Sequence, residues 1–346
     1  MEPTRRAVID IGTNSIKLLV ADVAGHEVRP VLEESKQTRL GQGFYLTHRL
    51  QPQAIAATAQ AVAAFSAAAR EARAASIRVV ATSAARDAVN PGELTSAIEQ
   101  AAGVKVEIVS GDQEADWVFQ GVTTDPALAQ APLLLLDVGG GSTEFILGRG
   151  EHKHFRGSFS LGTVRLLEKF PPSGPPKPED LAALRLWLKE FLVKQVQPEL
   201  EPAMRREVHG PQSTVHSPLS NVESLPTRRS LQLVGTGGTT SILARMEGRL
   251  ERFDRERIEG TRLSLDRVRW HTEHLWSLRL EERKKIIGLP PNRADVILPG
   301  VAIYEAVMEQ FGFAELRIST RGLRFAVVMD AVESPKVALG EGAHAA

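Results

Sequence analysis

Residues 133–148 have the sequence LLLLDVGGGSTEFILG, an apolar stretch, a turn with three glycines and two hydroxyls, and a second apolar stretch. This pattern predicts two β-strands joined by a glycine-rich turn. Residues 7–23, AVIDIGTNSIKLLVADV, repeat the pattern near the N-terminus. In both stretches an aspartate, Asp10 or Asp137, ends the first predicted strand. The repetition suggests an internal duplication, with two related hairpins at the centre of the fold.

The composition of the two turns favours phosphate binding. Glycine permits positive φ and close backbone approach, so successive N–H groups can point at one anion. Hydroxyls add further donors, and an aspartate supplies the hard oxygen ligands that divalent cations prefer. Two such hairpins facing one another would hold a phosphate chain and its metal ion. Taken singly, either hairpin could equally be an ordinary turn between strands.

The bulk composition narrows the class of protein. The 346 residues are enough for two domains, and the 42% hydrophobic and 24% charged residues are typical of a globular protein. Lys+Arg and Asp+Glu both number 42, which argues against a protein that coats DNA. The absence of cysteine excludes disulfides, cysteine-ligated metals and thiol nucleophiles. No apolar run suits a signal peptide or a membrane span, so the predicted location is the cytoplasm.

Predicted strands and helices alternate along the first half of the chain, which indicates an α/β fold. In the second half, a predicted helix runs to about Val196. Residues 201–230 show no periodicity and contain many turn formers, so we predict a long loop there. Residues 333–346 are small and polar and are predicted to be a flexible tail.

Two charged residues follow predicted strands in the first half. Glu114 lies in the first turn of a helix that Ser110 can cap, with Gln113 completing a capping box. Glu114 is therefore either a solvated carboxylate stabilised by the helix dipole or a general base that activates water. Arg86 is either a surface partner of Asp87 or a guanidinium that binds phosphate oxygens. Strand ends in α/β sheets are where ligand sites form.

Two further features could have either a purely structural role or a role in binding a ligand. Glu144 could be a plain strand residue, but it lies two positions after Ser142, close to the candidate metal ligand Asp137. The turn around Gly237 and Gly238 could be a tight strand-to-helix link, or could direct a helix N-terminus at an anion.

Seven segments, taken in order, give the chain a resemblance to a known family. They are AVIDIGTNSIKLLVADV, ATSAARDAVN, VEIVSGDQEADWVFQGV, LLLLDVGGGSTEFILG, VGTGGTTSILARM, PNRADVILPG and ISTRGLRFAVV. Together they cover roughly residues 5–330 and resemble the exopolyphosphatase / guanosine pentaphosphate phosphohydrolase (Ppx/GppA) family. The chain resembles a short form that lacks the C-terminal HD-type region, which puts long-chain processivity in doubt.

The resemblance implies two actin-like, ribonuclease-H-like lobes with an active-site cleft between them. The expected division is residues 1–124 for the first lobe and 125–317 for the second, with residues 318–332 packing back on the first. Glu114 matches the carboxylate that activates water, and Arg86 matches a phosphate-contacting arginine. The matching phosphate-binding residues are Gly12, Thr13, Asn14, Ser15, Gly139, Gly140, Gly141, Ser142 and Thr143. We add Gly237 and Gly238 to this group for the reason given above.

The expected cofactor is Mg²⁺, because Asp137 and Glu144 match the family's metal-binding acids and Asp10 stands in an equivalent place. The expected activity is hydrolysis of a terminal phosphoanhydride in polyphosphate, guanosine pentaphosphate or both. The family motifs do not decide between these substrates, and a homodimer is expected by analogy alone. The alternatives are an actin-like kinase that uses ATP and a sensor that binds polyphosphate or a guanosine polyphosphate without hydrolysing it.

Overall fold

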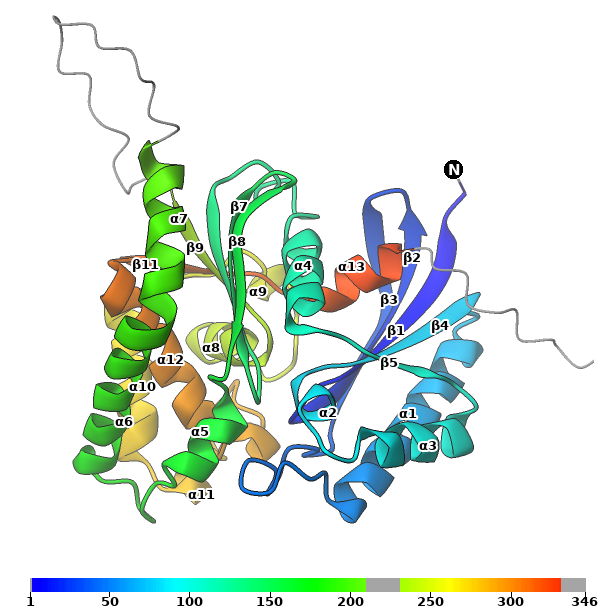
Figure 1. Cartoon of the computed structure of the whole chain (residues 1–346), viewed down its shortest axis with the longest axis horizontal. Coiled ribbons are helices and arrows are strands. Elements are labelled where there is room, and N and C mark those ends of the chain that lie inside the picture. The colour runs from blue at the N-terminus through cyan, green and yellow to red at the C-terminus, as the bar shows by residue number, and fades with distance from the viewer. Residues whose placement is uncertain (1, 210–230, 331–346) are drawn as a thin grey trace, which may run out of the picture.

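Two β-sheets form the centres of two lobes that lie side by side (Figure 1). The computed structural model describes residues 2–209 and 231–330. The strands of the first sheet are β1 (Thr4–Ile11), β2 (Ser15–Ala24), β3 (Glu27–Gln37), β4 (Ser76–Ala81) and β5 (Val106–Ile108). Those of the second are β6 (Leu133–Val138), β7 (Thr143–Arg149), β8 (His152–Phe159), β9 (Gln232–Thr236), β10 (Arg262–Ser264) and β11 (Glu315–Ile318).

The two sheets repeat one topology. The first has the order β3-β2-β1-β4-β5, and the second has the order β8-β7-β6-β9-β11 with β10 added at its edge. In each sheet the first hairpin is antiparallel and its first strand pairs in parallel with the next strand. The registers also correspond, since Asp10 lies opposite Lys17 and Asp137 lies opposite Glu144. The predicted α/β fold with two lobes is confirmed, and the repeat seen in the sequence is visible in its topology.

Helices α1 (Pro52–Glu71) and α3 (Pro91–Ala102) cover one face of the first sheet (Figure 1). The alanine-rich α1 packs against α3, β1 and β2 and buries Ile55, Val62 and Phe65 in the core of this lobe. A short helix, α2 (Ser83–Arg86), follows β4 directly. The end of β4 is therefore a sharp turn rather than a long loop.

The second lobe is larger and is organised around helix α12 (Ile297–Phe311), which is buried on almost every side. The other helices of this lobe are α5 (Thr163–Lys169), α6 (Pro178–Phe191), α7 (Gln197–His209), α8 (Gly238–Glu247), α9 (Arg255–Ile258), α10 (Leu265–Ser277) and α11 (Leu280–Arg283). Within the described ranges, no helix combines the length and the apolar character needed to cross a membrane.

Helices α4 (Gly111–Val122) and α13 (Leu323–Met329) pack against each other where the lobes join (Figure 1). Helix α4 lies against β7 and β8 of the second sheet, while α13 lies against β1 and β2 of the first. One apolar core accordingly contains Val8 and Leu19 from the first sheet together with Leu135 and Ile146 from the second. The lobes are joined through this core, and the C-terminal part of the described chain packs on the first lobe.

The predicted loop at 201–230 is wrong for its first part. After α6, a π-helical turn (Leu192–Val196) leads directly into α7, which continues to His209. Leu200, Ala203 and Met204 are buried at the i, i+3, i+4 spacing of an amphipathic helix. Pro202 and the many charged residues around it obscured this pattern. The remainder of the predicted loop, 210–230, and the predicted tail lie outside the described residues.

Candidate active site

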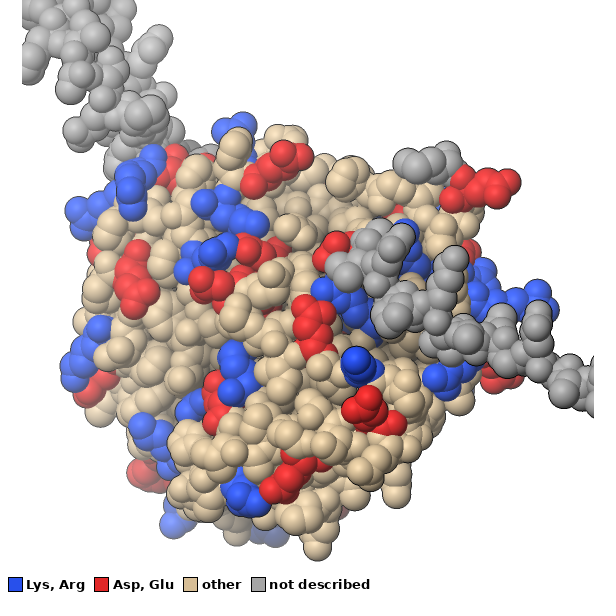
Figure 2. All heavy atoms as spheres, turned by 45° about the vertical axis from the view of Figure 1, so that its right-hand side comes forward, with Lys and Arg blue, Asp and Glu red and all other residues tan. Residues whose placement is uncertain are grey.

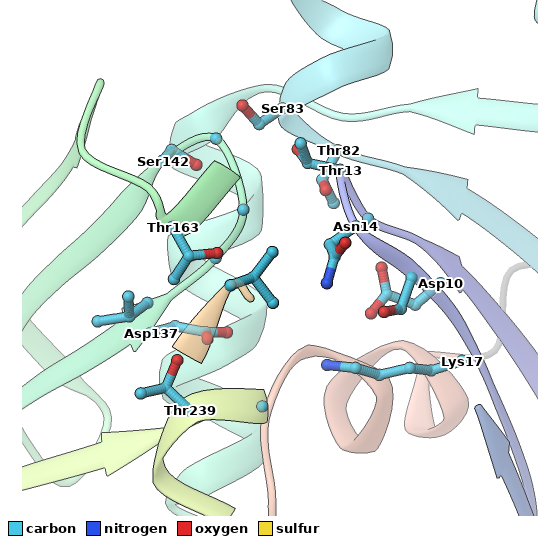
Figure 3. A pocket seen from close by; sticks show the side chains of 18 of the residues that line it. Asp10, Thr13, Asn14, Lys17, Thr82, Ser83, Asp137, Ser142, Thr163 and Thr239 are labelled. Atoms are coloured by element: carbon cyan, nitrogen blue, oxygen red, sulfur yellow. The ribbon is translucent and has the colours of Figure 1, made fainter. Parts of the chain in front are cut away.

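A cavity of about 100 Å³ lies between the turns of the two duplicated hairpins (Figure 3). Its walls come from both lobes: the β1–β2 turn and the residues after β4 on one side, and the β6–β7 turn and the start of α8 on the other. The lining residues are Asp10, Gly12, Thr13, Asn14, Ser15, Lys17, Thr82, Ser83, Glu114, Asp137, Val138, Gly139, Gly140, Gly141, Ser142, Glu144, Thr163, Gly238, Thr239, Ile242, Arg293, Val296, Ile297 and Leu323.

The two hairpin turns have the same internal hydrogen bond. The Gly12 N–H donates to the Ser15 carbonyl at 3.0 Å, and the Gly139 N–H donates to the Ser142 carbonyl at 2.9 Å. These two glycine N–H groups are therefore already used. Residues 13, 14, 140 and 141 line the cavity, and their N–H groups take no part in this turn bond.

Asn14 directs an amide at the cavity (Figure 3). Its side chain is buried, and its Oδ1 accepts a hydrogen bond from Gln37 Nε2 at 3.1 Å. This bond fixes which end of the amide faces the cavity. Among the described residues, Asn14 Nδ2 has no hydrogen-bond partner. A buried donor without a partner is costly, and an anionic ligand oxygen would satisfy it.

Three of the predicted phosphate-binding residues, Thr143, Gly237 and Arg86, do not line this cavity. Thr143 is fully buried and its hydroxyl donates to the Leu161 carbonyl, so the side chain is not available to a ligand. Gly237 has a φ of 94°, a conformation that suits glycine, and precedes α8 at the edge of a neighbouring cavity. Gly238 does line the central cavity.

Glu114 lies in the first turn of α4, and the residue is only 9% exposed. Ser110 caps the helix, as predicted, by accepting a hydrogen bond from the Gln113 N–H at 3.1 Å, but the Gln113 side chain does not complete the predicted capping box. Glu114 is thus free for another partner, and its Oε2 accepts from Arg86 Nη1 at 2.9 Å. Burial and the nearby Glu144 carboxylate raise the pKa of Glu114 well above its usual value, although Arg86 opposes the shift.

Arg86 connects Glu114 to a second cavity. Besides its bond to Glu114, its Nη1 donates to the Val109 carbonyl at 3.2 Å, and its Nε lies 3.6 Å from Asp87. The predicted ion pair with Asp87 is therefore present but is not the main contact. Arg86 lines a neighbouring cavity with Ser142 and other residues rather than the central one.

Glu144 is the other buried carboxylate near Glu114, with 1% of its surface exposed. Its Oε1 accepts hydrogen bonds from the hydroxyls of Ser142 and Ser158, both at 2.8 Å. Burial and the charge of Asp137 raise the pKa of Glu144 to about 7, while the two serines oppose the shift.

Asp10 and Asp137 occupy equivalent positions on the two hairpins, and Figure 3 shows their side chains on opposite sides of the cavity. Burial raises the pKa of both carboxyl groups, that of Asp137 to about 6. Lys17 extends between them and opposes both shifts (Figure 3). In residues 2–209 and 231–330 there is no group of three or more His, Asp or Glu side chains placed to hold a metal ion. The structure therefore does not bring Asp10, Asp137 and Glu144 into one ligand cluster.

Several residues that line the central cavity were not predicted from the sequence. Lys17 and Arg293 bring positive charge to the cavity, and burial lowers the pKa of both, that of Arg293 to about 10. Lys17 could have been found by aligning the two hairpins, where it corresponds to Glu144. Four hydroxyl residues that line the cavity were also not predicted: Thr82, Ser83, Thr163 and Thr239. They follow strands or begin helices, and no local pattern distinguishes them from ordinary turn residues.

A larger cavity of about 350 Å³ continues from the end marked by Asp10, Lys17 and Asp137. It has a mixed lining of charged, polar and apolar side chains. Its basic members include Arg245, Arg293 and Arg324, its acidic members Glu33 and Glu34, and its aromatic members Phe253 and Phe325. This mixture differs from a purely basic track for a polyanion.

Comparisons with known proteins agree on one family. Residues 19–334 match the model of the Ppx/GppA phosphatase family. The chain is 32% identical over 333 residues to Exopolyphosphatase 2 of Mycobacterium tuberculosis, covering 92% of this chain and 96% of that relative.

Solved structures show the same likeness over nearly the whole chain. An exopolyphosphatase from Cytophaga hutchinsonii is 26% identical with a TM-score of 0.80, covering 95% of this chain and 99% of that one. A Ppx/GppA family member from Aquifex aeolicus is 27% identical with a TM-score of 0.72, covering 94% and 97%. The fold is thus the actin-like one, and the chain belongs to the Ppx/GppA phosphatase family.

Proposed function

We propose that the chain is an exopolyphosphatase that releases terminal orthophosphate from inorganic polyphosphate by attack of water. One observation carries the proposal: two duplicated Asp–Gly hairpins face one cavity, and the buried Glu114 carboxylate forms part of its wall. The names of similar proteins, exopolyphosphatases of Mycobacterium tuberculosis and Cytophaga hutchinsonii, support the choice of substrate.

Glu114 is the proposed general base. Phosphoryl transfer depends mainly on positioning and charge neutralisation, so the protein must aim a water and stabilise the phosphate oxygens. A carboxylate with a raised pKa accepts a proton from water more readily than an exposed one. Arg86 holds Glu114 in place through the 2.9 Å ion pair and supplies positive charge next to it.

The two turns are the proposed binding site for the terminal phosphates. The N–H groups of residues 13, 14, 140 and 141 and the Asn14 amide would donate to non-bridging oxygens. Lys17 and Arg293 would neutralise the negative charge of the chain.

Asp10 and Asp137 fit a Mg²⁺ ion. Mg²⁺ is usually bound by one or two carboxylates together with waters and substrate phosphates, rather than by a complete protein cage. Two half-buried carboxylates with raised pKa values supply such a donor set. Glu144 is left out of the set, because its carboxylate is held by Ser142 and Ser158. When bound, Mg²⁺ would neutralise non-bridging phosphate oxygens.

We expect Asp137→Asn to stabilise the free protein and to weaken its response to Mg²⁺. The pKa of Asp137 is raised from 3.8 to about 6, so the wild type loses stability as the pH rises from about 4 to about 6. Asparagine removes that loss, and above pH 6 the free energy of unfolding of the variant should be about 3 kcal/mol higher than that of the wild type. Mg²⁺ should then raise the unfolding free energy of the wild type more than that of the variant.

Urea unfolding with and without Mg²⁺ checks this expectation. At a pH near 4 the two proteins should have similar stability, which serves as the internal control. An Asn variant that gains as much from Mg²⁺ as the wild type would remove Asp137 from the metal site.

We expect Glu144→Gln to move the acid limb of the pH profile to lower pH. Glu114 must be ionised to act as a base, so activity falls when the pH drops through its pKa. Removing the negative charge of Glu144 lowers that pKa, since repulsion between the two carboxylates contributes to its increase. The measurement is kcat/KM for orthophosphate release as a function of pH, with the exposed Glu99→Gln as the control. An acid limb that stays in place or moves to higher pH would contradict the assignment.

Guanosine pentaphosphate is the second candidate substrate. The cavity of about 350 Å³ next to the phosphate site has aromatic and polar walls as well as basic ones, which suits an organic group. Incubating the protein and Mg²⁺ with each substrate separately, and comparing initial rates of orthophosphate release, decides between them.

Two further measurements, ADP formation and calorimetric binding, test the other classes of function. ADP formation from ATP with a small-molecule acceptor, without phosphate release from polyphosphate, would indicate a kinase. Binding of polyphosphate in calorimetry without any product would indicate a sensor. The cytoplasmic location and the homodimer stay predictions.

A further inference from the structure

Residues 39–48 form a strap between β3 and α1, on the opposite side of the lobe junction from α4 and α13 (Figure 1). Arg39 and His48, the first and last residues of the strap, have positive φ values of 51° and 52°. Leu40 and Phe44 are fully buried and anchor the strap in the core of the first lobe. The strap is thus an ordered segment with a fixed path.

The strap is hydrogen-bonded to the first phosphate turn, which is the β1–β2 turn at residues 12–15. The Gly41 N–H donates to the Thr13 carbonyl at 2.7 Å, and the Arg39 N–H donates to the Asn14 carbonyl at 3.0 Å. A Cβ on Gly41 would lie 2.2 Å from Thr13 Cγ2, so a larger residue here would force the Thr13 side chain to move. The positions of Thr13 and Asn14 are therefore coupled to the position of the strap.

The strap also binds the second lobe, chiefly through Glu168 of α5. The Glu168 carboxylate accepts the N–H of Gly43 at 2.7 Å and the N–H of Tyr45 at 3.3 Å. A second link joins Arg39 to Asp295 at 2.8 Å. These links are at least partly exposed. Figure 2 shows that charged side chains of both signs are interspersed over one face of the molecule.

Tyr45 links the strap, through Arg165, to the second phosphate turn, which is the β6–β7 turn at residues 139–142. The Arg165 guanidinium lies 4.2 Å above the Tyr45 ring, and Arg165 Nε donates to the Gly141 carbonyl at 2.9 Å. A Cβ on Gly141 would lie 2.4 Å from the Tyr45 hydroxyl and equally close to Ser83 Oγ. The glycines of this turn thus accommodate the first lobe, in addition to any ligand.

We propose that Glu168 is a positioning residue, which acts through the strap to set the distance between the two phosphate turns. The inference rests on the proposed function, because the two turns are the proposed phosphate site. Loss of the Glu168 carboxylate removes both of its hydrogen bonds to the strap and leaves the Tyr45–Arg165 contact as the link to α5. The first turn, with Thr13 and Asn14, can then move away from the second. The terminal phosphate is then no longer held in line with the water that Glu114 activates.

The effect on rate should exceed the effect on stability. Exposed links of this kind contribute little to the free energy of unfolding. A displacement of about 1 Å at a reacting centre, by contrast, can lower the rate by about 10²-fold. This contrast separates positioning from a general structural role.

The first test measures kcat, KM and thermal unfolding for three variants. Glu168→Ala should lower kcat by at least about tenfold with little change in the unfolding midpoint. Glu168→Gln keeps one acceptor oxygen for the two N–H groups and should recover part of the rate. Leu46→Ala, in the same strap but 88% exposed, is the matched control and should behave like the wild type. A kcat that is unchanged in Glu168→Ala, or that falls only together with stability, would overturn the proposal.

The second test does not depend on activity. The chain has no cysteine, so Leu46→Cys on the strap and Leu186→Cys on α6 give two unique spin-label sites, both exposed. The label-to-label distance distribution should be narrow in the labelled wild-type background and broad after Glu168→Ala. Adding imidotriphosphate, a slowly hydrolysed phosphate chain, should narrow it again. A distribution that Glu168→Ala leaves narrow would refute the strap mechanism even if the enzyme hydrolyses polyphosphate.

Different results would refute the proposed function and the inference about Glu168. If the wild type releases no orthophosphate from polyphosphate or guanosine pentaphosphate, the proposed function is wrong. If the wild type is active and Glu168→Ala is equally active, only the inference about Glu168 is wrong.

Discussion

Replacing Glu114 with alanine is expected to lower kcat for orthophosphate release by about 10²–10⁴-fold, the usual contribution of a general base. The carboxylate is buried at the cavity wall, held by Arg86 and raised in pKa, so it is suited to take a proton from water. The variant should still bind polyphosphate, because the two turns and the cations Lys17 and Arg293 are unchanged.

The measurement combines single-turnover release of orthophosphate with calorimetric binding of polyphosphate. Asp112→Ala is the matched control, since Asp112 lies in the first turn of the same helix with 67% of its side chain exposed. The control should retain normal turnover. Near-normal turnover by Glu114→Ala would remove Glu114 from the mechanism, and loss of binding as well would mean that it serves the ligand rather than the water.

Replacing Gly121 with alanine is expected to destabilise the whole molecule by about 1–3 kcal/mol, the cost of forcing an extra methyl group into a packed core. Gly121 lies on α4 where this helix meets the start of α13. A Cβ there would lie 2.0 Å from the Gly322 carbonyl oxygen and 2.6 Å from its carbon, which are backbone atoms that cannot rotate away. Helix α13 would have to shift, and with it the shared core that joins the lobes.

Thermal and urea unfolding of Gly121→Ala measure the loss. Gly92→Ala is the matched control, because Gly92 is a helical glycine of α3 whose Cβ would meet nothing within 4 Å. The control should be neutral or more stable by up to about 1 kcal/mol, since alanine reduces the freedom of the unfolded chain. A Gly121→Ala protein as stable as the wild type would show that the contact between α4 and α13 is loose.

Local chemistry explains which elements were predictable. Alternating apolar residues and glycine-rich turns depend on neighbours in the chain, and they identified both hairpins and Asp10 and Asp137 at equivalent positions. The Ser110 cap was predictable for the same reason, because its partner Gln113 is three residues away. Helix α7 was missed because its three buried residues, Leu200, Ala203 and Met204, are surrounded by charges and Pro202.

The contacts that give the site its chemistry are not local. From the sequence, Glu114 resembles a solvated helix residue. In the folded protein, Arg86, 28 positions earlier in the chain, and Glu144 lie next to it. Residue spacing along a helix or strand says nothing about such partners.

By itself, the sequence determined the two hairpins, the alternation of strands and helices, and the kinds of side chain that gather near phosphate. Tertiary structure alone decided that Lys17 enters the cavity, that Thr143 is buried away from it, and that the strap reaches Glu168 on the other lobe. The physical reason is that hydrophobic periodicity is set by neighbours within one turn or one strand, whereas charge pairing and burial are set by surfaces that meet only when both lobes are folded.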